Sequence, residues 1–343
     1  GYLENIYHWD IKSAYPHAMS ILPDFKKGRW IHINDKVNYK KYKDNVGFFK
    51  INVDVKEKNI SPFTFRSESG EVLFPRGKFT THTTNYELSK ALDYYDFDLF
   101  NLDGFVFIPD NNDETEFNKL IKEMYDTRMK QTNEGQKYVY KVIINSIYGK
   151  TAQSKPEPKG IFNPIMCASI TGHTRSILLD VAKDNKEDIV MFATDGIFSK
   201  KKINVDIGKK LGQFDFEFHP KFILLMAGIY SYNTEKIPEL KPKSRGFSLK
   251  VYEGFGENRK SKMFDFDEYK IIEEDGNYFY QVMNIRPLSI AKSVIEHKYN
   301  PKTIGKMIDV PKKIDINGDH KRIWFKKLKS IYDYSESNTM LLY

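Results

Sequence analysis

The sequence has almost no cysteine, and this absence excludes a large class of proteins. Its 343 residues include one cysteine, Cys167, so an internal disulfide framework is excluded and a reducing compartment such as the cytoplasm is favoured. No apolar run approaches the roughly 20 residues that a membrane-spanning helix needs, and no signal-peptide pattern opens the sequence. We therefore expect a protein without disulfides and without a membrane partner.

Repeats and low-complexity segments are lacking too, whereas apolar and aromatic residues are plentiful. Hydrophobic residues make up 40% of the chain and aromatic residues 15%, which excludes a disordered protein. A chain of this length predicts two or more subdomains. The net charge is +8, and residues 241–343 hold 20 basic and 14 acidic residues, a net +6. This excess predicts an anionic partner, with the C-terminal part as the first candidate for a nucleic-acid surface.

Hydrophobic periodicity predicts the main elements of the first half. Residues 47–55 alternate as expected for a strand, and residues 86–95 predict a short helix. Residues 115–131 carry an apolar stripe at helical spacing, and a second helix over residues 137–150 follows after a break at Gly135. Two adjacent helices between strand-rich parts predict a helical hairpin.

A first candidate site lies near the N-terminus, in residues 9–16, WDIKSAYP. The aromatic and apolar residues before it favour a strand that ends at Asp10, and Pro16 can open a helix. A carboxylate at a strand end, followed by the hydroxyl of Ser13 and the ring of Tyr15, predicts a platform for a metal and a ligand. Asp before a turn is equally typical of ordinary turn chemistry.

A second candidate lies on the helix over residues 137–150. Lys141, Asn145 and Tyr148 are spaced four and three residues apart, so they share one face of the helix. Gly149 would let another backbone approach closely. A polar face that only meets solvent is the alternative, although Asn145 and the serine after it are poor residues for a helix interior.

A third candidate is the segment of residues 189–198. It predicts a strand, a tight turn and a second strand, with Thr194, Asp195 and Gly196 at the tip. Such a hairpin needs no function of its own. Its interest comes from the two candidates that precede it.

Together the three stretches resemble the three polymerase motifs of family B DNA polymerases. The first motif, Asp followed by Ser and Tyr-Pro, matches residues 10–16; the second, Lys-x-x-x-Asn-Ser-x-Tyr-Gly, matches residues 141–149. Thr194-Asp195 resembles the second half of the third motif, Asp-Thr-Asp. The resemblance is closest to the protein-primed branch of phages, viruses and linear plasmids. That branch has a Lys-x-Tyr and a basic-Gly pattern, which are echoed at Ile229-Tyr230 and in residues 243–246, KSRG.

The resemblance implies a two-metal nucleotidyl transfer. Asp10, Asp195 and the Ile11 carbonyl would be the oxygen ligands of two Mg²⁺ ions, with Mn²⁺ as a substitute. Primer-template DNA, deoxynucleoside triphosphates and a priming terminal protein are the implied partners. The nucleotide-binding residues implied by the family's motifs are Ser13, Tyr15, Arg128, Lys141, Asn145 and Tyr148, and the DNA-binding ones are Gly149, Thr194, Tyr230, Lys243 and Arg245.

Each implied role has a chemical reason. Lys141 and Arg128 would neutralise the triphosphate. Tyr15 would lie under the sugar and exclude a 2′-hydroxyl group, and Tyr148 would pack beside the nascent base pair. The residues assigned to DNA would hold the primer-terminus backbone, a contact that positions the strand without reading its sequence.

The chain departs from the family's pattern at four points. Ala193 replaces the first Asp of the third motif, Gly196 replaces the Ser after it, and Gly228 stands where Lys-x-Tyr has its lysine. The proofreading exonuclease that usually precedes the first motif is not seen before Asp10, so it was either removed or never present. These departures leave two alternatives open: a polymerase-fold protein that binds nucleic acid with impaired catalysis, and untemplated or primer-independent synthesis.

The implied fold is α+β, a right-hand polymerase fold. Residues 1–59 and 163–232 would form the palm with its antiparallel sheet, and residues 60–110 an insertion that could contact a priming protein or duplex. Residues 111–162 would form the helical fingers and residues 233–343 a basic thumb.

Overall fold

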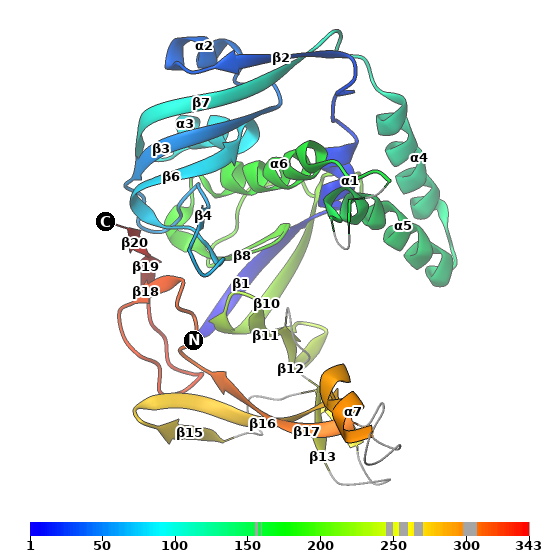
Figure 1. Ribbon diagram of the computed structural model, residues 1–343. Coiled ribbons are helices and arrows are strands. Elements are labelled where there is room, and N and C mark those ends of the chain that lie inside the picture. The colour runs from blue at the N-terminus through cyan, green and yellow to red at the C-terminus, as the bar shows by residue number, and fades with distance from the viewer. Residues whose placement is uncertain are drawn as a thin grey trace. The chain divides into compact units, whose positions relative to one another are not determined.

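The computed structural model describes residues 1–154, 157–158, 160–244, 250–253, 260–263, 270–297 and 307–342 (Figure 1). The chain forms two compact units. The larger unit comprises residues 7–217, 321–323 and 338–343, and the smaller unit comprises residues 1–6, 218–320 and 324–337. None of the described helices combines the length and the apolarity needed to cross a membrane.

A five-stranded sheet is the main element of the larger unit. Its order is β2 (Gly28–Ile33), β7 (Phe97–Pro109), β3 (Gly47–Val55), β6 (Arg76–Thr84) and β20 (Leu341–Leu342), with only β20 and its neighbour parallel. The predicted strand over residues 47–55 is confirmed as β3. Its alternate residues face the core, because successive side chains of a strand point to opposite sides.

This sheet crosses a boundary predicted between residues 59 and 60. Strand β3 lies before the boundary, yet it is hydrogen-bonded on one side to β6 and on the other to β7. Residues 60–110 and residues 1–59 therefore share one sheet, and β3 would lose both of its neighbouring strands without residues 60–110. Strand β7 mixes polar and apolar residues in its first half and carries a continuous apolar run over residues 105–108.

A helix of the insertion covers this sheet. Helix α3 (Asn85–Tyr94) contacts β3, β6 and helix α6 (Pro164–Ala182), and its Leu88 is fully buried. The N-cap Thr84 and Glu87 form a capping box, in which each side chain bonds to the backbone of the other. The helix predicted over residues 86–95 is confirmed within one residue at each end.

The candidate site is carried by a second group of strands. In the larger unit, β1 (Tyr2–Ile11) pairs with β9 (Gly196–Ser199), and β9 pairs with β8 (Ile189–Ala193), all antiparallel. Helix α6 packs on them through a core that includes Trp9, Ile197 and Leu178. Helix α1 (Ala14–Met19) follows β1 after a short turn.

The predicted helical hairpin is present as α4 (Glu116–Lys130) and α5 (Glu134–Ala152), which lie side by side in Figure 1. Gly135 does not separate them as predicted. It lies in the first turn of α5, because the Asn133 side chain caps that helix by accepting the N–H groups of Gly135 and Gln136. The base of the hairpin joins α1 and α6 in one core around Ile121, Ile144 and Ile170.

Short elements complete the larger unit and the links to the smaller one. They are α2 (Lys36–Lys41), β4 (Phe65–Arg66), β5 (Val72–Leu73), the 3₁₀ turn η1 (Lys186–Asp188), β18 (Arg322–Trp324) and β19 (Ser337–Thr339).

The smaller unit consists mainly of antiparallel strands. One group is the end of β10 (Phe214–Met226) with β11 (Ile229–Thr234) and β12 (Ile237–Ser244), and its core includes Ile223 and Ile229. The remaining elements are the sheet β15 (Ile271–Glu274), β16 (Asn277–Pro287) and β17 (Met307–Asp315), the pair β13 (Lys250–Glu253) and β14 (Lys260–Met263), and α7 (Ile290–His297).

Candidate active site

The two candidate aspartates lie at one end of the β1–β9–β8 group. Asp10 on β1 pairs with Gly196 on β9, and the N–H of Ile11 donates to the Asp195 carbonyl oxygen across 3.0 Å. The Asp10 side chain keeps 52% of its surface exposed. Asp10 and the turn that carries Asp195 are thus neighbours although 185 positions separate them in the chain, and a ligand from solvent can reach Asp10.

The turn that carries Asp195 is held in an uncommon conformation. Thr194 has φ 65°, and the N–H of Asp195 donates to the Ala193 carbonyl oxygen at 2.9 Å. Left-handed backbone at a β-branched residue is rare, and such strain persists only where the surrounding structure maintains it. The hairpin therefore fixes the backbone of Asp195 next to β1.

Gly196 is explained by the space that Asp10 needs. A Cβ atom at Gly196 would lie 2.5 Å from Asp10 Oδ1 and 3.1 Å from His8 Nε2. His8 Nε2 itself lies 3.8 Å from Asp10 Oδ1, and its ring stacks on Phe198. A side chain at position 196 would require the Asp10 carboxylate to shift from its present place.

Ser13 and Arg128 lie in contact, although 115 residues separate them. Arg128 on α4 donates from Nη1 to Ser13 Oγ at 3.1 Å, and Ser13 has φ 50° at the start of α1. Arg128 Nε is buried without a hydrogen-bond partner among the described residues. A buried guanidinium N–H without a partner is costly, so this atom is suited to an incoming anion.

Tyr15 and Tyr148, predicted on different elements, also meet. Their ring centroids are 4.3 Å apart with an interplanar angle of 46°. Burial raises the pKa of Tyr148 to about 12, and the neighbouring Cys167 and Tyr15 act in the same direction. The Tyr148 phenol is therefore neutral at physiological pH, and the two rings form one tyrosine wall between α1 and α5.

The remaining predicted residues of α5 face solvent. Lys141, Asn145 and Gly149 are exposed, and no atom lies within 4 Å of the place that a Cβ of Gly149 would take. Lys141 forms no ion pair with any residue that the structure describes. By contrast, Lys137 one turn earlier pairs with Glu134, and Lys122 on α4 pairs with Glu114.

The other predicted DNA contacts belong to the smaller unit. Tyr230 on β11 lies directly opposite Lys243 on β12; Tyr230 is 8% exposed, whereas Lys243 is exposed with its Nζ 5.8 Å from the ring centroid of Tyr232. Gly228 has φ 94° in the turn between β10 and β11, which explains why a lysine does not occupy this position. Arg245 lies outside the described residues.

Two residues beside Asp10 were missed from the sequence. His8 shares a face of β1 with Asp10, because residues two apart in a strand point the same way. His8 Nδ1 lies 4.0 Å from Glu217 Oε2 on β10. The spacing of His8 and Asp10 could have revealed the first, but nothing local in the sequence places Glu217 near them.

Comparison with known proteins identifies the relatives of this chain. The family model for DNA polymerase type B, organellar and viral, matches residues 1–166. A probable DNA polymerase of Agaricus bitorquis is 31% identical over 160 residues, which cover 45% of this chain and 19% of that protein. The DNA polymerase of Acidianus bottle-shaped virus (isolate Italy/Pozzuoli) is 24% identical over 379 residues, covering 92% of this chain and 54% of that protein. Residues 1–166 of this chain are therefore similar to the organellar and viral type B DNA polymerases.

Solved structures show the fold of the chain. Phi29 DNA polymerase complexed with primer-template DNA and incoming nucleotide substrates matches with a TM-score of 0.61 and 16% identity, over 92% of this chain and 58% of that one. Its orthorhombic crystal form matches with a TM-score of 0.53 over 72% and 52%. The predicted right-hand polymerase fold is confirmed. The chain spans less than two thirds of the length of each of these relatives.

Proposed function

We propose that this chain is a template-directed DNA polymerase that adds deoxynucleotides to a primer 3′-hydroxyl group. The observation that carries the proposal is the pairing of Asp10 with Gly196, which brings the carboxylate of Asp10 beside the turn of Asp195. The similarity to type B DNA polymerases supports the same reaction class. Two further contacts support it: Arg128 of α4 with Ser13, and Tyr148 of α5 with Tyr15 of α1.

Asp10, Asp195 and the Ile11 carbonyl fit a pair of divalent cations, Mg²⁺ or Mn²⁺. Hard oxygen donors from one or two carboxylates suit Mg²⁺, and the half-exposed side chain of Asp10 leaves room for a substrate phosphate as a further ligand. Bound ions would supply activation of the 3′-hydroxyl group and stabilisation of the leaving pyrophosphate. The chain's own part would be to hold the two carboxylates, Asp10 through the β1–β9 register and Asp195 through the Thr194 turn.

The incoming deoxynucleoside triphosphate would lie between α1 and the helical hairpin. Arg128 and Lys141, which no described carboxylate neutralises, would bind its phosphates. Ser13 orients the Arg128 guanidinium through the 3.1 Å hydrogen bond, and Asn145 follows Lys141 by one helical turn. Tyr15 and Tyr148 would contact the sugar and the nascent base pair.

Primer-template DNA is the proposed macromolecular partner. Gly149, Thr194, Tyr230, Lys243 and Arg245 would hold the sugar-phosphate backbone at the primer terminus. A priming terminal protein is a further proposed partner, with residues 60–110 as its contact. The limits of the palm (residues 1–59 and 163–232), the fingers (111–162) and the thumb (233–343) remain predictions.

Primer extension tests the proposal directly. Purified chain is incubated with a labelled primer, deoxynucleotides and Mg²⁺ or Mn²⁺, with and without a template. We expect extension only on the template, with the added nucleotides complementary to it. Extension without template would support untemplated synthesis, and DNA binding without any extension would support the impaired, binding-only alternative.

Replacing Tyr15 with alanine tests the sugar contact. We expect the ratio of ribonucleotide to deoxyribonucleotide incorporation to rise about tenfold or more, because removing the ring opens space for a 2′-hydroxyl group that only shape had rejected. The ratio is measured by single-nucleotide incorporation with matched triphosphates. Tyr7→Ala, a partly buried tyrosine on β1 outside the proposed pocket, is the control. An unchanged ratio in a folded variant would show that Tyr15 does not gate the sugar.

Replacing Gly149 with alanine should have opposite effects on folding and on DNA binding. The free energy of unfolding should rise by about 0.5–1 kcal/mol, since glycine in a helix interior is destabilising and the added methyl group meets no atom of the chain. Affinity for primer-template should fall several-fold if the DNA backbone uses this open space. Thermal melting and fluorescence anisotropy measure the two quantities. A more stable variant with unchanged affinity would remove Gly149 from the DNA surface.

A further inference from the structure

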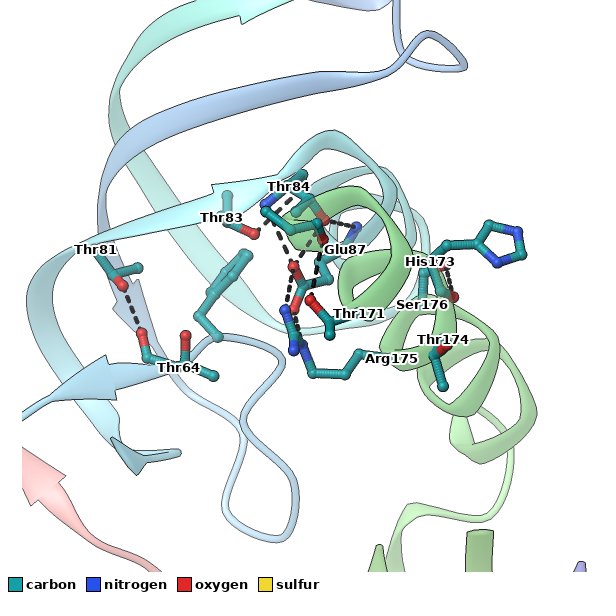
Figure 2. A network of polar contacts seen from close by, with 12 residues as sticks. Thr64, Thr81, Thr83, Thr84, Glu87, Thr171, His173, Thr174, Arg175 and Ser176 are labelled. Atoms are coloured by element: carbon teal, nitrogen blue, oxygen red, sulfur yellow. Dashed lines mark hydrogen bonds and ion pairs between the residues drawn. The ribbon is translucent and has the colours of Figure 1, made fainter. Parts of the chain in front are cut away.

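A buried carboxylate of the insertion is bound to a cation of helix α6. Glu87 on α3 accepts hydrogen bonds from Arg175 Nε at 2.6 Å and Nη2 at 3.2 Å, so the pair is bidentate (Figure 2). The Glu87 side chain is only 5% exposed, and that of Arg175 is 37% exposed. Bidentate arginine–carboxylate contacts fix geometry as well as charge, and this one joins two helices that are 88 residues apart in the chain.

The same carboxylate also fixes the start of α3. Glu87 accepts from Thr84 Oγ1 at 2.7 Å and from the Thr84 N–H at 3.3 Å, which completes the capping box. Gly172 lets α6 lie directly against this cap, since a Cβ atom there would be 2.2 Å from Thr84 Oγ1. The Arg175 guanidinium is therefore held by a helix terminus that is itself tied to the five-stranded sheet.

Helix α6 connects this ion pair with the tyrosine wall of the active site. Cys167, Thr171 and Arg175 are spaced by four residues and so share one face of the helix. Towards its N-terminal end, Ile170 and Met166 of the same helix belong to the core against which Tyr15 and Tyr148 pack. Burial lowers the pKa of Arg175, but Glu87 raises it overall. Helix α6 thus joins the ion pair at Arg175 to the packing around both rings.

Resting on the proposed function, we propose that the Glu87–Arg175 pair is a positioning element for the nucleotide pocket. Helix α3 of the insertion holds Arg175, and α6 packs Ile170 and Met166 in the core that keeps the Tyr148 ring against Tyr15. Neither Glu87 nor Arg175 needs to contact the nucleotide for this role. The insertion is then part of the machinery that shapes the site for the incoming base pair, in addition to any partner it binds.

Cys167 provides a readout that does not depend on polymerase activity. It is the single cysteine of the chain, so the rate at which the folded protein reacts with a thiol reagent such as DTNB reports on this one sulfur. Glu87→Gln removes the charge but keeps the size, and Gln at this position still supports a capping box. Cys167 is a partly buried residue of α6. We expect it to react at least about fivefold faster in this variant, because weakening the bidentate contact loosens α6 by the equivalent of one ordinary hydrogen bond.

The matched control is Asp93→Asn, which removes a carboxylate from the same helix. Asp93 is 40% exposed and lies 3.9 Å from Lys43, away from Arg175. In Asp93→Asn, the rate at which DTNB labels Cys167 should equal that of the parent. Arg175→Lys keeps a cation opposite Glu87 but loses the bidentate contact, so a smaller acceleration is expected, and this variant decides the matter if Glu87→Gln does not fold. The proposal would be overturned if Cys167 in Glu87→Gln and Arg175→Lys reacted at the parent's rate. It would also be overturned if the fraction of unfolded protein accounted for the whole increase in rate.

Steady-state kinetics distinguishes positioning from a general loss of structure. The KM for the deoxynucleotide should rise about tenfold in Glu87→Gln, since small displacements of positioning groups have effects of this order or larger. Affinity for primer-template should stay at the parent's value. If the parent chain extends no primer, the proposed function is refuted. The labelling rate of Cys167 then decides the positioning role by itself. An active Glu87→Gln variant with unchanged KM would refute the positioning role alone.

Discussion

Asp10→Asn and Asp195→Asn should each abolish nucleotide incorporation while the chain stays folded. Asparagine keeps the size of the side chain but loses the negative charge that holds a divalent cation. Loss of a metal-bound transition state costs several kcal/mol, so a rate decrease of about a thousandfold or more is expected. Single-turnover primer extension, with DNA affinity measured in parallel, separates this catalytic loss from a loss of binding.

A matched control is available for this test on the five-stranded sheet. Asp98 on β7 is also a strand aspartate with an exposed side chain, and it lies 3.5 Å from Lys56. Asp98→Asn should extend primers at the parent's rate. If Asp10→Asn or Asp195→Asn also kept that rate, the two-carboxylate assignment would be wrong and the site would have to be sought elsewhere. Substituting Mn²⁺ for Mg²⁺ should rescue neither variant fully, because one oxygen ligand remains uncharged.

The elements with strong local patterns were predictable from the sequence. Strand β3 was predicted with its observed bounds, and the helices α3 and α4 within one residue at each end. In each case the periodicity of apolar residues carries the information locally, and for the two helices the capping side chains at the start add to it. The nearness of Asp10 to Asp195 was also predictable, because the resemblance to the family's motifs implies that both lie at the ends of neighbouring strands.

Contacts between distant segments were not predictable, since they depend on the register in which the segments meet. Glu217 near His8 and Arg175 on Glu87 are set by tertiary packing. In the sequence, Glu87 is recognisable only as part of a helix-capping pattern. Arg175 is recognisable only as a basic residue within an otherwise apolar helix. The role of Gly196 likewise depends on where the Asp10 carboxylate lies across the strand pair.

The second large effect is expected for Lys141→Ala on the helical hairpin. Lys141 is an exposed lysine of α5 that pairs with no described carboxylate. It stands one helical turn before Asn145, and Tyr148 of the same helix contacts Tyr15. A cation in this place would meet the triphosphate in the bound state and again in the transition state, where charge moves onto the leaving group. Removing such an electrostatic contact typically lowers kcat about 10²–10³-fold.

Lys137→Ala is the matched control, since it removes a lysine one turn earlier that is already paired with Glu134. Titration of deoxynucleotide in single-turnover extension gives the apparent affinity and the maximal rate of each variant. For Lys141→Ala we expect both to worsen, because the contact is made in ground and transition states alike. The affinity for primer-template should not change. If Lys141→Ala instead lost DNA affinity and bound deoxynucleotide as tightly as the Lys137→Ala variant, the lysine would belong to the template strand's path, and Arg128 would remain as the proposed cation for the triphosphate.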